Sequence, residues 1–277
     1  MIRFSQERVR RIAHVVRRAV KNRPVRQRAE NMRSGTVPPD MATLSIATWN
    51  IHSCVGNDAR FDPERVARVI SDLDVDLIGL QEIGWHHRGE SGFDQFAYLG
   101  EATGMSALAA PTKKSDRAHY GNAILTRLPV LRHDPLDLTI GRREPRGGVD
   151  VVVSVGEVPV RVIVAHLGLD PWERARQVGR IIGMVEEEPD LPTLFMGDLN
   201  EWTPSSPRLR SLSATFDDQV APRSFHAKLP TLRLDRIYAR GGLAIPAYTA
   251  VRSPATRLAS DHLPVRATIA VPAAVQR

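Results

Sequence analysis

The stretch TLFMGDLN at residues 193–200 joins an apolar run to polar residues at its carboxyl end. Its apolar run predicts a short buried β-strand, and the polar residues Asp198 and Asn200 follow at the carboxyl end of that strand. If the extended geometry persists through residue 200, these two side chains point to the same side. The stretch therefore predicts a strand that delivers a carboxylate and an amide to one place.

The same pattern recurs in predicted strands on both sides of this stretch, at 44–48, 76–82, 158–167, 234–239 and 263–271. Each of these apolar or alternating runs has polar residues at or beside one of its ends. A turn cap explains any one of them, because Asn and Asp favour turns. Together they predict a shared site, since side chains at strand ends converge at one end of a sheet. The residues are Asn50, Glu82, His166, Asp198, Asn200, Asp235, Asp261 and His262.

Amphipathic helices are predicted between these strands. Residues 63–71 form one, with Asp62 as N-cap and Pro63 at the first helical position, and residues 171–188 form another after Asp170. The runs 149–155 and 158–167 predict a hairpin that turns near Gly156. The alternation of strands and helices predicts an α/β protein.

Composition excludes several classes of protein. The chain has 277 residues, of which 42% are hydrophobic and 25% charged, so it is not disordered throughout. No run of 18 apolar residues predicts a spanning helix. The single cysteine, Cys54, excludes an internal disulfide and a cysteine-built metal centre. It favours a reducing compartment, and we expect a cytoplasmic protein that is soluble or peripherally membrane-bound.

Basic charge is concentrated at the amino terminus. Residues 1–40 hold eleven Lys and Arg against three acidic residues, a net charge of +8, which leaves −1 for residues 41–277. Apolar residues recur at helical spacing between Val9 and Val20, so the arm predicts a basic amphipathic helix. Such a helix binds an anionic membrane surface or nucleic-acid phosphates; a solvated extension is the alternative. Ser34-Gly35 and Pro38-Pro39 predict a linker, so residues 1–40 form an arm and residues 41–277 the catalytic domain.

Seven short segments resemble, in family order, the signature segments of the endonuclease/exonuclease/phosphatase superfamily. This superfamily includes deoxyribonuclease I, exonuclease III-type AP endonucleases, inositol polyphosphate 5-phosphatases and neutral sphingomyelinases. The resemblance implies a four-layer α/β sandwich of two mixed, mainly antiparallel β-sheets flanked by helices. The segments are TWNIH (48–52), LQE (80–82), YGNAIL (120–125), AHLG (165–168), GDLN (197–200), LDRI (234–237) and SDH (260–262).

Hydrolysis of a phosphate ester requires more than proton transfer. Enzymes lower reaction barriers by about 8–23 kcal/mol, whereas general acid–base catalysis supplies a factor of only about 10²–10⁴. Electrostatic stabilisation supplies most of the rest, which favours a divalent metal. The carboxylate and amide oxygens suit Mg²⁺ or Mn²⁺ better than zinc. The resemblance implies that Glu82, Asn50 and Asp261 bind or support this metal.

The remaining catalytic roles follow from the resemblance. The family pairs the His262 position with a distant Asp, here Asp235, and such a carboxylate fixes the imidazole tautomer. His262 then serves as general base or stays protonated to stabilise the transition state, with Asp198 as the rival base that activates water. Asn200 holds a phosphoryl oxygen, and His166 contacts the phosphate.

Three further residues are predicted to contact substrate. Asn122 lies in YGNAIL, and Arg146 belongs to a cluster with Arg142 and Arg143 that suits a bidentate phosphate contact. An Asp occupies the place of His52 in the AP endonucleases. A neutral imidazole there removes a negative charge, so we expect His52 to touch substrate or to order Asn50 rather than to bind Mg²⁺.

The predicted function is a divalent-metal-dependent hydrolase of phosphate esters, most consistent with phosphodiesters, in which activated water attacks in line. The substrate class stays open among phospholipids, nucleic acids and inositol or sugar phosphates, because one fold hosts many functions. One alternative is a Mg²⁺-dependent DNA or RNA nuclease that uses the basic arm, although a near-neutral body argues against a dedicated nucleic-acid binder. The other is an inactive adaptor, which predicts decayed site residues, whereas the matched positions keep competent side chains.

Overall fold

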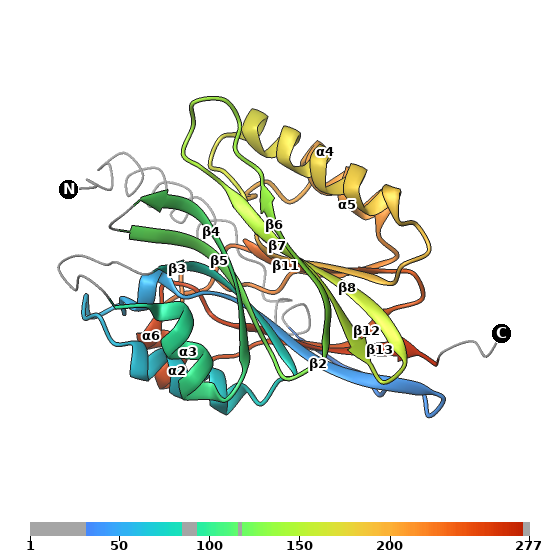
Figure 1. Cartoon of the computed structure of the whole chain (residues 1–277), viewed down its shortest axis with the longest axis horizontal. Coiled ribbons are helices and arrows are strands. Elements are labelled where there is room, and N and C mark those ends of the chain that lie inside the picture. Colours follow the sequence, from blue (N-terminus) through green and yellow to red (C-terminus); the bar gives the residue numbers. More distant parts are fainter. Residues whose placement is uncertain (1–31, 85–92, 116–117, 274–277) are drawn as a thin grey trace.

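Two β-sheets pack face to face, and helices cover their outer faces (Figure 1). The computed structural model describes residues 32–84, 93–115 and 118–273. The predicted sandwich of two mixed, mainly antiparallel sheets is confirmed. Within the described residues the strand pairs β2–β3 and β8–β9 are parallel, and the other named pairs are antiparallel.

The first sheet has seven strands and the second has six. The order of the first is β1 (Met32–Ser34), β12 (Ala244–Ala250), β13 (Val265–Pro272), β2 (Met41–Asn50), β3 (Leu77–Gly84), β5 (Ala118–Thr126) and β4 (Ser106–Ser115). The order of the second is β10 (Asp218–Val220), β11 (Asp235–Arg240), β9 (Thr193–Asp198), β8 (Val158–His166), β7 (Gly147–Val155) and β6 (Val130–Asp137).

The helices lie on opposite sides of the sandwich (Figure 1). The helices α2 (Pro63–Leu73) and α3 (Gln95–Thr103) flank the seven-stranded sheet, with the short helices η1 (His52–Cys54) and α6 (Pro254–Ala259) beside them. The helices α4 (Pro171–Glu187) and α5 (Pro207–Thr215) cover the six-stranded sheet. The expected N-caps are confirmed: Asp62 accepts from the Arg65 amide, and Asp170 accepts from the amides of Trp172 and Glu173.

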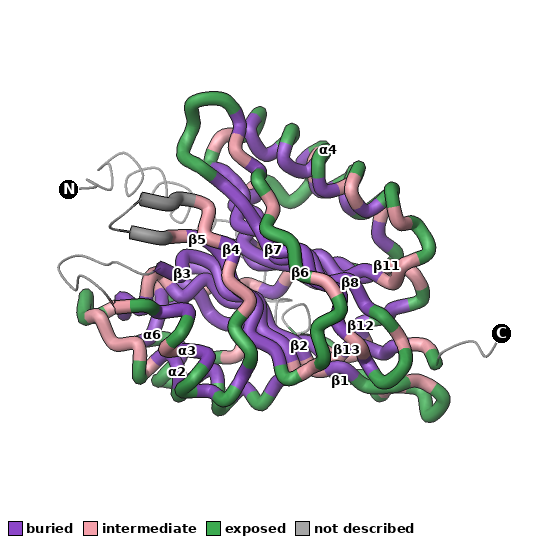
Figure 2. The backbone as a smooth tube through the Cα atoms, viewed as in Figure 1, coloured by how far each residue is buried: buried purple, intermediate pink, exposed green. Residues whose placement is uncertain are grey.

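Three apolar layers hold the sandwich together, and the strands that form them are buried along most of their length (Figure 2). The central layer lies between the sheets, and the outer layers lie under the helices. Gly79 of β3 lies in the central contact, where an added Cβ would come within 2.6 Å of Val164. Glycine at this position therefore allows the two sheets to approach closely.

The seven-stranded sheet begins upstream of Met41, where the sequence placed the start of the folded domain. Residues 32–34 form β1, which pairs with β12, and Nη1 of Arg33 donates to the carbonyl of Ile245 at 2.8 Å. The sequence could not show this pairing, because a three-residue edge strand has no periodicity of its own. The amphipathic segment from Val9 to Val20 lies outside the described residues. No helix in the described ranges is long and apolar enough to cross a membrane.

Candidate active site

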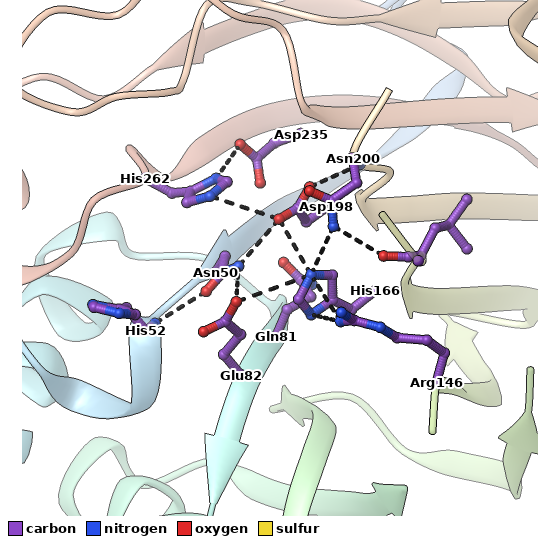
Figure 3. A network of polar contacts seen from close by, with 12 residues as sticks. Asn50, His52, Gln81, Glu82, Arg146, His166, Asp198, Asn200, Asp235 and His262 are labelled. Atoms are coloured by element: carbon purple, nitrogen blue, oxygen red, sulfur yellow. Dashed lines mark hydrogen bonds and ion pairs between the residues drawn. The ribbon is translucent and has the colours of Figure 1, made fainter. Parts of the chain in front are cut away.

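The predicted polar residues meet where the two parallel strand pairs end (Figure 3). Asn50 at the end of β2 pairs with Gln81 of β3, and His166 at the end of β8 pairs with Asp198 of β9. The two ends face each other across the sandwich. Nδ2 of Asn50 lies 3.1 Å from Oε1 of Glu82 and 3.1 Å from Oδ2 of Asp198, so one amide joins carboxylates from both sheets.

Glu82 reaches this position through an irregularity in β3. The pairing of β3 with β5 shifts register between Gln81 and Ile83, and Glu82 has a positive φ of 56°. A bulge of this kind re-aims a side chain that regular alternation would direct elsewhere. Tyr120, which the sequence did not identify as a site residue, hydrogen-bonds to this carboxylate, and burial together with the Glu82 charge raises the pKa of Tyr120 well above its usual value.

His262 is held by the expected carboxylate and by contacts that the sequence did not reveal. Its Nδ1 lies 2.9 Å from Oδ2 of the buried Asp235, and Ser224 donates a short hydrogen bond to the same oxygen. The ring of Phe225 packs at 4.7 Å between centroids, and the Trp49 indole donates to the carbonyl of His262 at 3.0 Å. The imidazole orientation is therefore fixed from several sides.

The electrostatics favour a charged imidazole between two carboxylates. Nε2 of His262 lies 3.6 Å from Oδ2 of Asp198, opposite the Asp235 contact. Burial alone lowers the pKa of His262, but the charges of Asp235 and Asp198 outweigh this effect and raise it to about 10. Burial raises the pKa of Asp198, while the nearby His262 acts in the opposite direction. The pair is suited to exchange a proton with a bound water or substrate oxygen.

His166 lies between hydrogen-bond donors and the carboxylates of the site, with Nε2 3.5 Å from Oδ2 of Asp198 and 4.0 Å from Oε1 of Glu82. Nδ2 of Asn200 donates to the Leu167 carbonyl at 2.9 Å and lies 3.0 Å from Nε2 of His166. Because a carbonyl only accepts, this contact fixes the orientation of the Asn200 amide. Nη1 of the buried Arg146 lies 3.1 and 3.2 Å from the two ring nitrogens, and Nη2 donates to Glu144 at 2.8 Å. The structure thus brings Arg146 into the site.

Asn200 reaches the site in a different way from the one predicted. The strand β9 ends at Asp198, and Asn200 has a left-handed backbone with φ of 49°. The strand alternation expected to align the two side chains therefore stops before residue 200. A tight turn replaces it, in which the amide N–H of Asn200 donates to Oδ1 of Asp198 at 2.9 Å. The turn still directs both side chains into the site.

His52 orders Asn50, as one of its two expected roles, but through the backbone. The amide N–H of His52 donates to Oδ1 of Asn50 at 3.0 Å, while its imidazole Nδ1 lies 3.0 Å from the Val55 carbonyl. The NH₂ group of Asn50 faces the two carboxylates, and its oxygen faces the backbone of His52. Asn50 therefore aligns Glu82 and Asp198, and its support of a metal stays a prediction.

The last two predicted residues lie on either side of this centre. Nδ2 of Asn122 donates to the carbonyl of Gly147, next to Arg146, and its buried Oδ1 has no hydrogen-bond partner within the described residues. The hydroxyl of Ser260 donates to the carbonyl of Asn50 at 2.7 Å, and Oδ1 of Asp261 lies 3.4 Å from the same hydroxyl oxygen. A substrate contact by Asn122 and a metal contact by Asp261 stay predictions.

The donor set fits a hard divalent cation. Glu82 and Asp198 are buried carboxylates that share one amide donor, and Mg²⁺ is usually held by one or two carboxylates together with water and substrate phosphate. Residues 32–84, 93–115 and 118–273 contain no group of three or more His, Cys, Asp or Glu side chains placed to hold a metal ion on their own. Metal binding by Glu82 therefore stays a prediction.

A buried ion cluster supports the loops that carry His166 and Asn200. Glu201 follows Asn200 directly, and its Oε2 lies 2.6 Å from Nε of Arg208 and 3.5 Å from Nε of Arg174. Nη1 of Arg174 in turn donates to the carbonyls of Gly168 and Leu169, which follow His166. An acidic residue beside GDLN is the one sequence feature of this cluster, because its partners are distant in the chain.

Comparison with known proteins agrees with this arrangement. The model of the endonuclease/exonuclease/phosphatase family matches residues 47–262. The Escherichia coli protein YbhP is 26% identical over 244 residues, which cover 82% of this chain and 96% of YbhP.

Two solved structures show the same fold. A Beutenbergia cavernae endonuclease/exonuclease/phosphatase is 22% identical with a TM-score of 0.68, over 83% of this chain and 72% of that one. The mannosyl-6-phosphatase Bt3783 of Bacteroides thetaiotaomicron is 17% identical with a TM-score of 0.61, over 82% of this chain and 99% of that one. With the family model matching most of its length, the chain belongs to the endonuclease/exonuclease/phosphatase family, whose members are metal-dependent phosphoesterases.

Proposed function

We propose that the protein hydrolyses phosphodiesters with Mg²⁺ or Mn²⁺ as cofactor. One observation carries the proposal: the amide of Asn50 joins the buried carboxylates Glu82 and Asp198, and Asp198 lies beside the Asp235–His262 pair. A proton-transfer pair thus adjoins the oxygen ligands that a hard cation prefers. An inactive adaptor would have no need to keep this set of buried charges together.

Each site residue has a distinct role in the proposed hydrolysis. A divalent ion held by Glu82 supplies charge neutralisation at the phosphoryl oxygens when it is bound. Asp198 orients the attacking water, and His262, fixed by Asp235, exchanges a proton with water or with the leaving oxygen. His166, Asn200 and the Arg146 guanidinium bind and orient the phosphoryl group, because their polar atoms lie together at the ends of β8 and β9.

The charge of the site favours a diester over a monoester. Three buried carboxylates, Glu82, Asp198 and Asp235, lie near two cationic side chains, His262 and Arg146. The guanidinium of Arg146 also donates to the exposed Glu144. A phosphodiester carries one negative charge, whereas a monoester approaches two at neutral pH. The five buried residues and a bound divalent ion together carry a charge of about +1, which a diester neutralises and a monoester exceeds.

A matched substrate pair tests the proposal. Bis-p-nitrophenyl phosphate and p-nitrophenyl phosphate release the same chromophore from a diester and a monoester. With EDTA-treated protein and added Mg²⁺, Mn²⁺ or Zn²⁺, we expect release from the diester with Mg²⁺ or Mn²⁺, and its loss in the His262→Asn variant. Faster release from the monoester would reassign the protein to the phosphatases, and cleavage of plasmid DNA alone would favour the nuclease alternative.

We further propose that the basic amino-terminal arm holds anionic substrates near this site. Residues that pair across neighbouring strands connect Met32 of β1 to Ala47 of β2. The pairs are Met32–Thr249, Thr249–Arg266 and Arg266–Ala47. Neighbouring strands lie about 4.8 Å apart, so Met32 is about 15 Å from Ala47, three residues before Asn50. The arm therefore joins the fold at the catalytic end. Deletion of residues 1–31 should weaken binding to anionic vesicles or DNA, and unchanged binding to both would contradict this role.

A further inference from the structure

Large exposed apolar side chains gather at the catalytic end of the sandwich. Seven are exposed in the described part of the chain: four lie on segments close to site residues, and a fifth, Met32, lies on β1 at the same end. The other two, Val130 and Leu131, lie at the start of β6, at the opposite end of the six-stranded sheet. Grouping of this kind marks an interaction surface, whereas singly scattered apolar residues are ordinary. The five are Met32, Leu169, Trp172, Leu229 and Leu258.

One group lies on the segment that follows His166. Leu169 and Trp172 are three and six residues beyond it, and 56% of Trp172 is exposed. The guanidinium groups of Arg143 and Arg176 lie 5.9 and 5.0 Å from the centre of the indole ring. Arg143 also approaches the Asp170 carboxylate at 3.4 Å, which joins the loop before β7 to this segment. The indole is therefore held at the surface between two cations.

A second group lies on the segments around His262. Leu229 is four residues after Phe225, whose ring packs on His262, and Leu258 is two residues before Ser260. These segments contact each other, because Nη2 of Arg257 donates to the carbonyl of Lys228 at 3.2 Å. Exposed Leu side chains thus again stand beside exposed basic ones.

The chemistry of both groups matches an anionic lipid interface. Aromatic and aliphatic side chains next to Lys and Arg are typical of surfaces that insert shallowly among lipid headgroups. Acidic residues on the first group's segments are largely compensated, since Asp170 pairs with Arg143 and Glu144 pairs with Arg146. Single-stranded nucleic acid would instead require rings for base stacking, and three of the four side chains are leucines.

We propose that Leu169, Trp172, Leu229 and Leu258, with their neighbouring Arg and Lys residues, dock the protein onto an anionic lipid bilayer. We call these four residues the mouth surface. Docking places the catalytic end of the sandwich against the headgroups, where a lipid phosphodiester is presented to the site. The membrane contact stands on the exposed residues alone, and the identity of the substrate rests on the proposed function.

Vesicle sedimentation with the full-length chain tests the docking surface. Two double variants, Leu169→Ser/Trp172→Ala and Leu229→Ser/Leu258→Ser, are compared with Val130→Ser/Leu131→Ser at the opposite end. The probe is phosphatidylcholine vesicles with about 30% phosphatidylglycerol, and all proteins keep residues 1–31. We expect each mouth variant to lower the bound-to-free ratio about tenfold or more, because two exposed side chains leave the interface. The control variant should bind like the wild type.

Equal vesicle binding by all variants would overturn the proposal. It would also be overturned if the wild type bound no vesicles but bound a single-stranded oligonucleotide tightly, and the mouth variants abolished that binding. Thermal unfolding verifies that each variant is folded. A double variant that does not fold is replaced by one of its own single changes, such as Trp172→Ala for the first group. Turnover of soluble bis-p-nitrophenyl phosphate is measured in parallel. Mouth variants that keep this turnover but lose vesicle binding support docking. If the wild type binds vesicles but cleaves no phosphate ester, the proposed function fails while the docking surface stands.

Discussion

Nε2 of His262 lies 3.6 Å from Oδ2 of Asp198, although the two residues belong to different sheets. His262 lies three residues before β13 of the seven-stranded sheet, and Asp198 ends β9 of the six-stranded sheet. The candidate site therefore forms only when the two sheets pack against each other. Catalysis therefore depends on the packing of the central apolar layer.

Replacement of the imidazole or of its buried partner should remove activity without unfolding the protein. His262→Asn and Asp235→Asn each disrupt the 2.9 Å contact that fixes the imidazole tautomer. We expect kcat on bis-p-nitrophenyl phosphate to fall by about 10²–10⁴-fold, the usual contribution of proton transfer. Circular dichroism checks the fold, and kcat within twofold of the wild type in either variant would refute the role of this pair.

The Glu201 cluster should position Asn200 and His166. We expect Glu201→Gln to lower kcat by about 10- to 100-fold with little change in KM, because small displacements of catalytic groups are costly. The matched control is Asp150→Asn, which weakens the buried Asp150–Arg161 pair on β7 and β8, away from the site. Both variants should lose stability, measured by urea unfolding. Equal losses of kcat in the two would show that Glu201 acts through stability alone.

Two glycines should respond oppositely to the same substitution. Gly79→Ala introduces a Cβ that would lie 2.6 Å from Val164 in the contact between the sheets, so the free energy of unfolding should fall by about 1–3 kcal/mol. Gly183 lies in α4 with no atom within 4 Å of an added Cβ, and Gly183→Ala should raise it by about 0.5–1 kcal/mol. Urea unfolding measures both, and a neutral Gly79→Ala would show that the sheets adjust freely.

The buried thiol of Cys54 should make stability fall at alkaline pH. Burial and, to a lesser degree, Asp62 raise the pKa of Cys54 well above its usual range, so the native thiol stays protonated while the unfolded thiol ionises above about pH 8.5. The stabilisation is complete below that pH and is lost above it by about 1.4 kcal/mol per pH unit. In urea unfolding, the wild type should therefore lose its advantage over Cys54→Ala between pH 8 and 10. Parallel pH curves for the two proteins would disprove this.

Much of the fold and of the site could be predicted from the sequence because its signals are local. Apolar runs that end in Asn50, Glu82, His166 and Asp198 mark strands whose ends lie together, and Asp62 and Asp170 mark helix starts. The two-sheet sandwich was expected from the family resemblance that the signature segments carry. These features depend on residues adjacent in the chain, so periodicity and capping reveal them.

The remaining features depend on contacts between distant segments. The bulge at Glu82, the left-handed turn at Asn200 and the Arg174–Glu201 contact leave no periodic trace. The orientation of Asn50 is likewise set by the amide of His52 and by two carboxylates, not by its own motif. The proposed membrane contact depends on exposed residues such as Trp172, which no catalytic motif contains.

Titration with Mn²⁺, followed by an activity assay, tests whether Glu82 holds the metal ion on which turnover depends. EDTA-treated wild type and the Glu82→Gln variant are titrated with Mn²⁺ by electron paramagnetic resonance, and the same samples are assayed with bis-p-nitrophenyl phosphate. We predict saturable Mn²⁺ binding and metal-dependent turnover in the wild type, and loss of both in Glu82→Gln. Equal Mn²⁺ binding and equal turnover in the two proteins would contradict the assignment of Glu82 and of the site built around it.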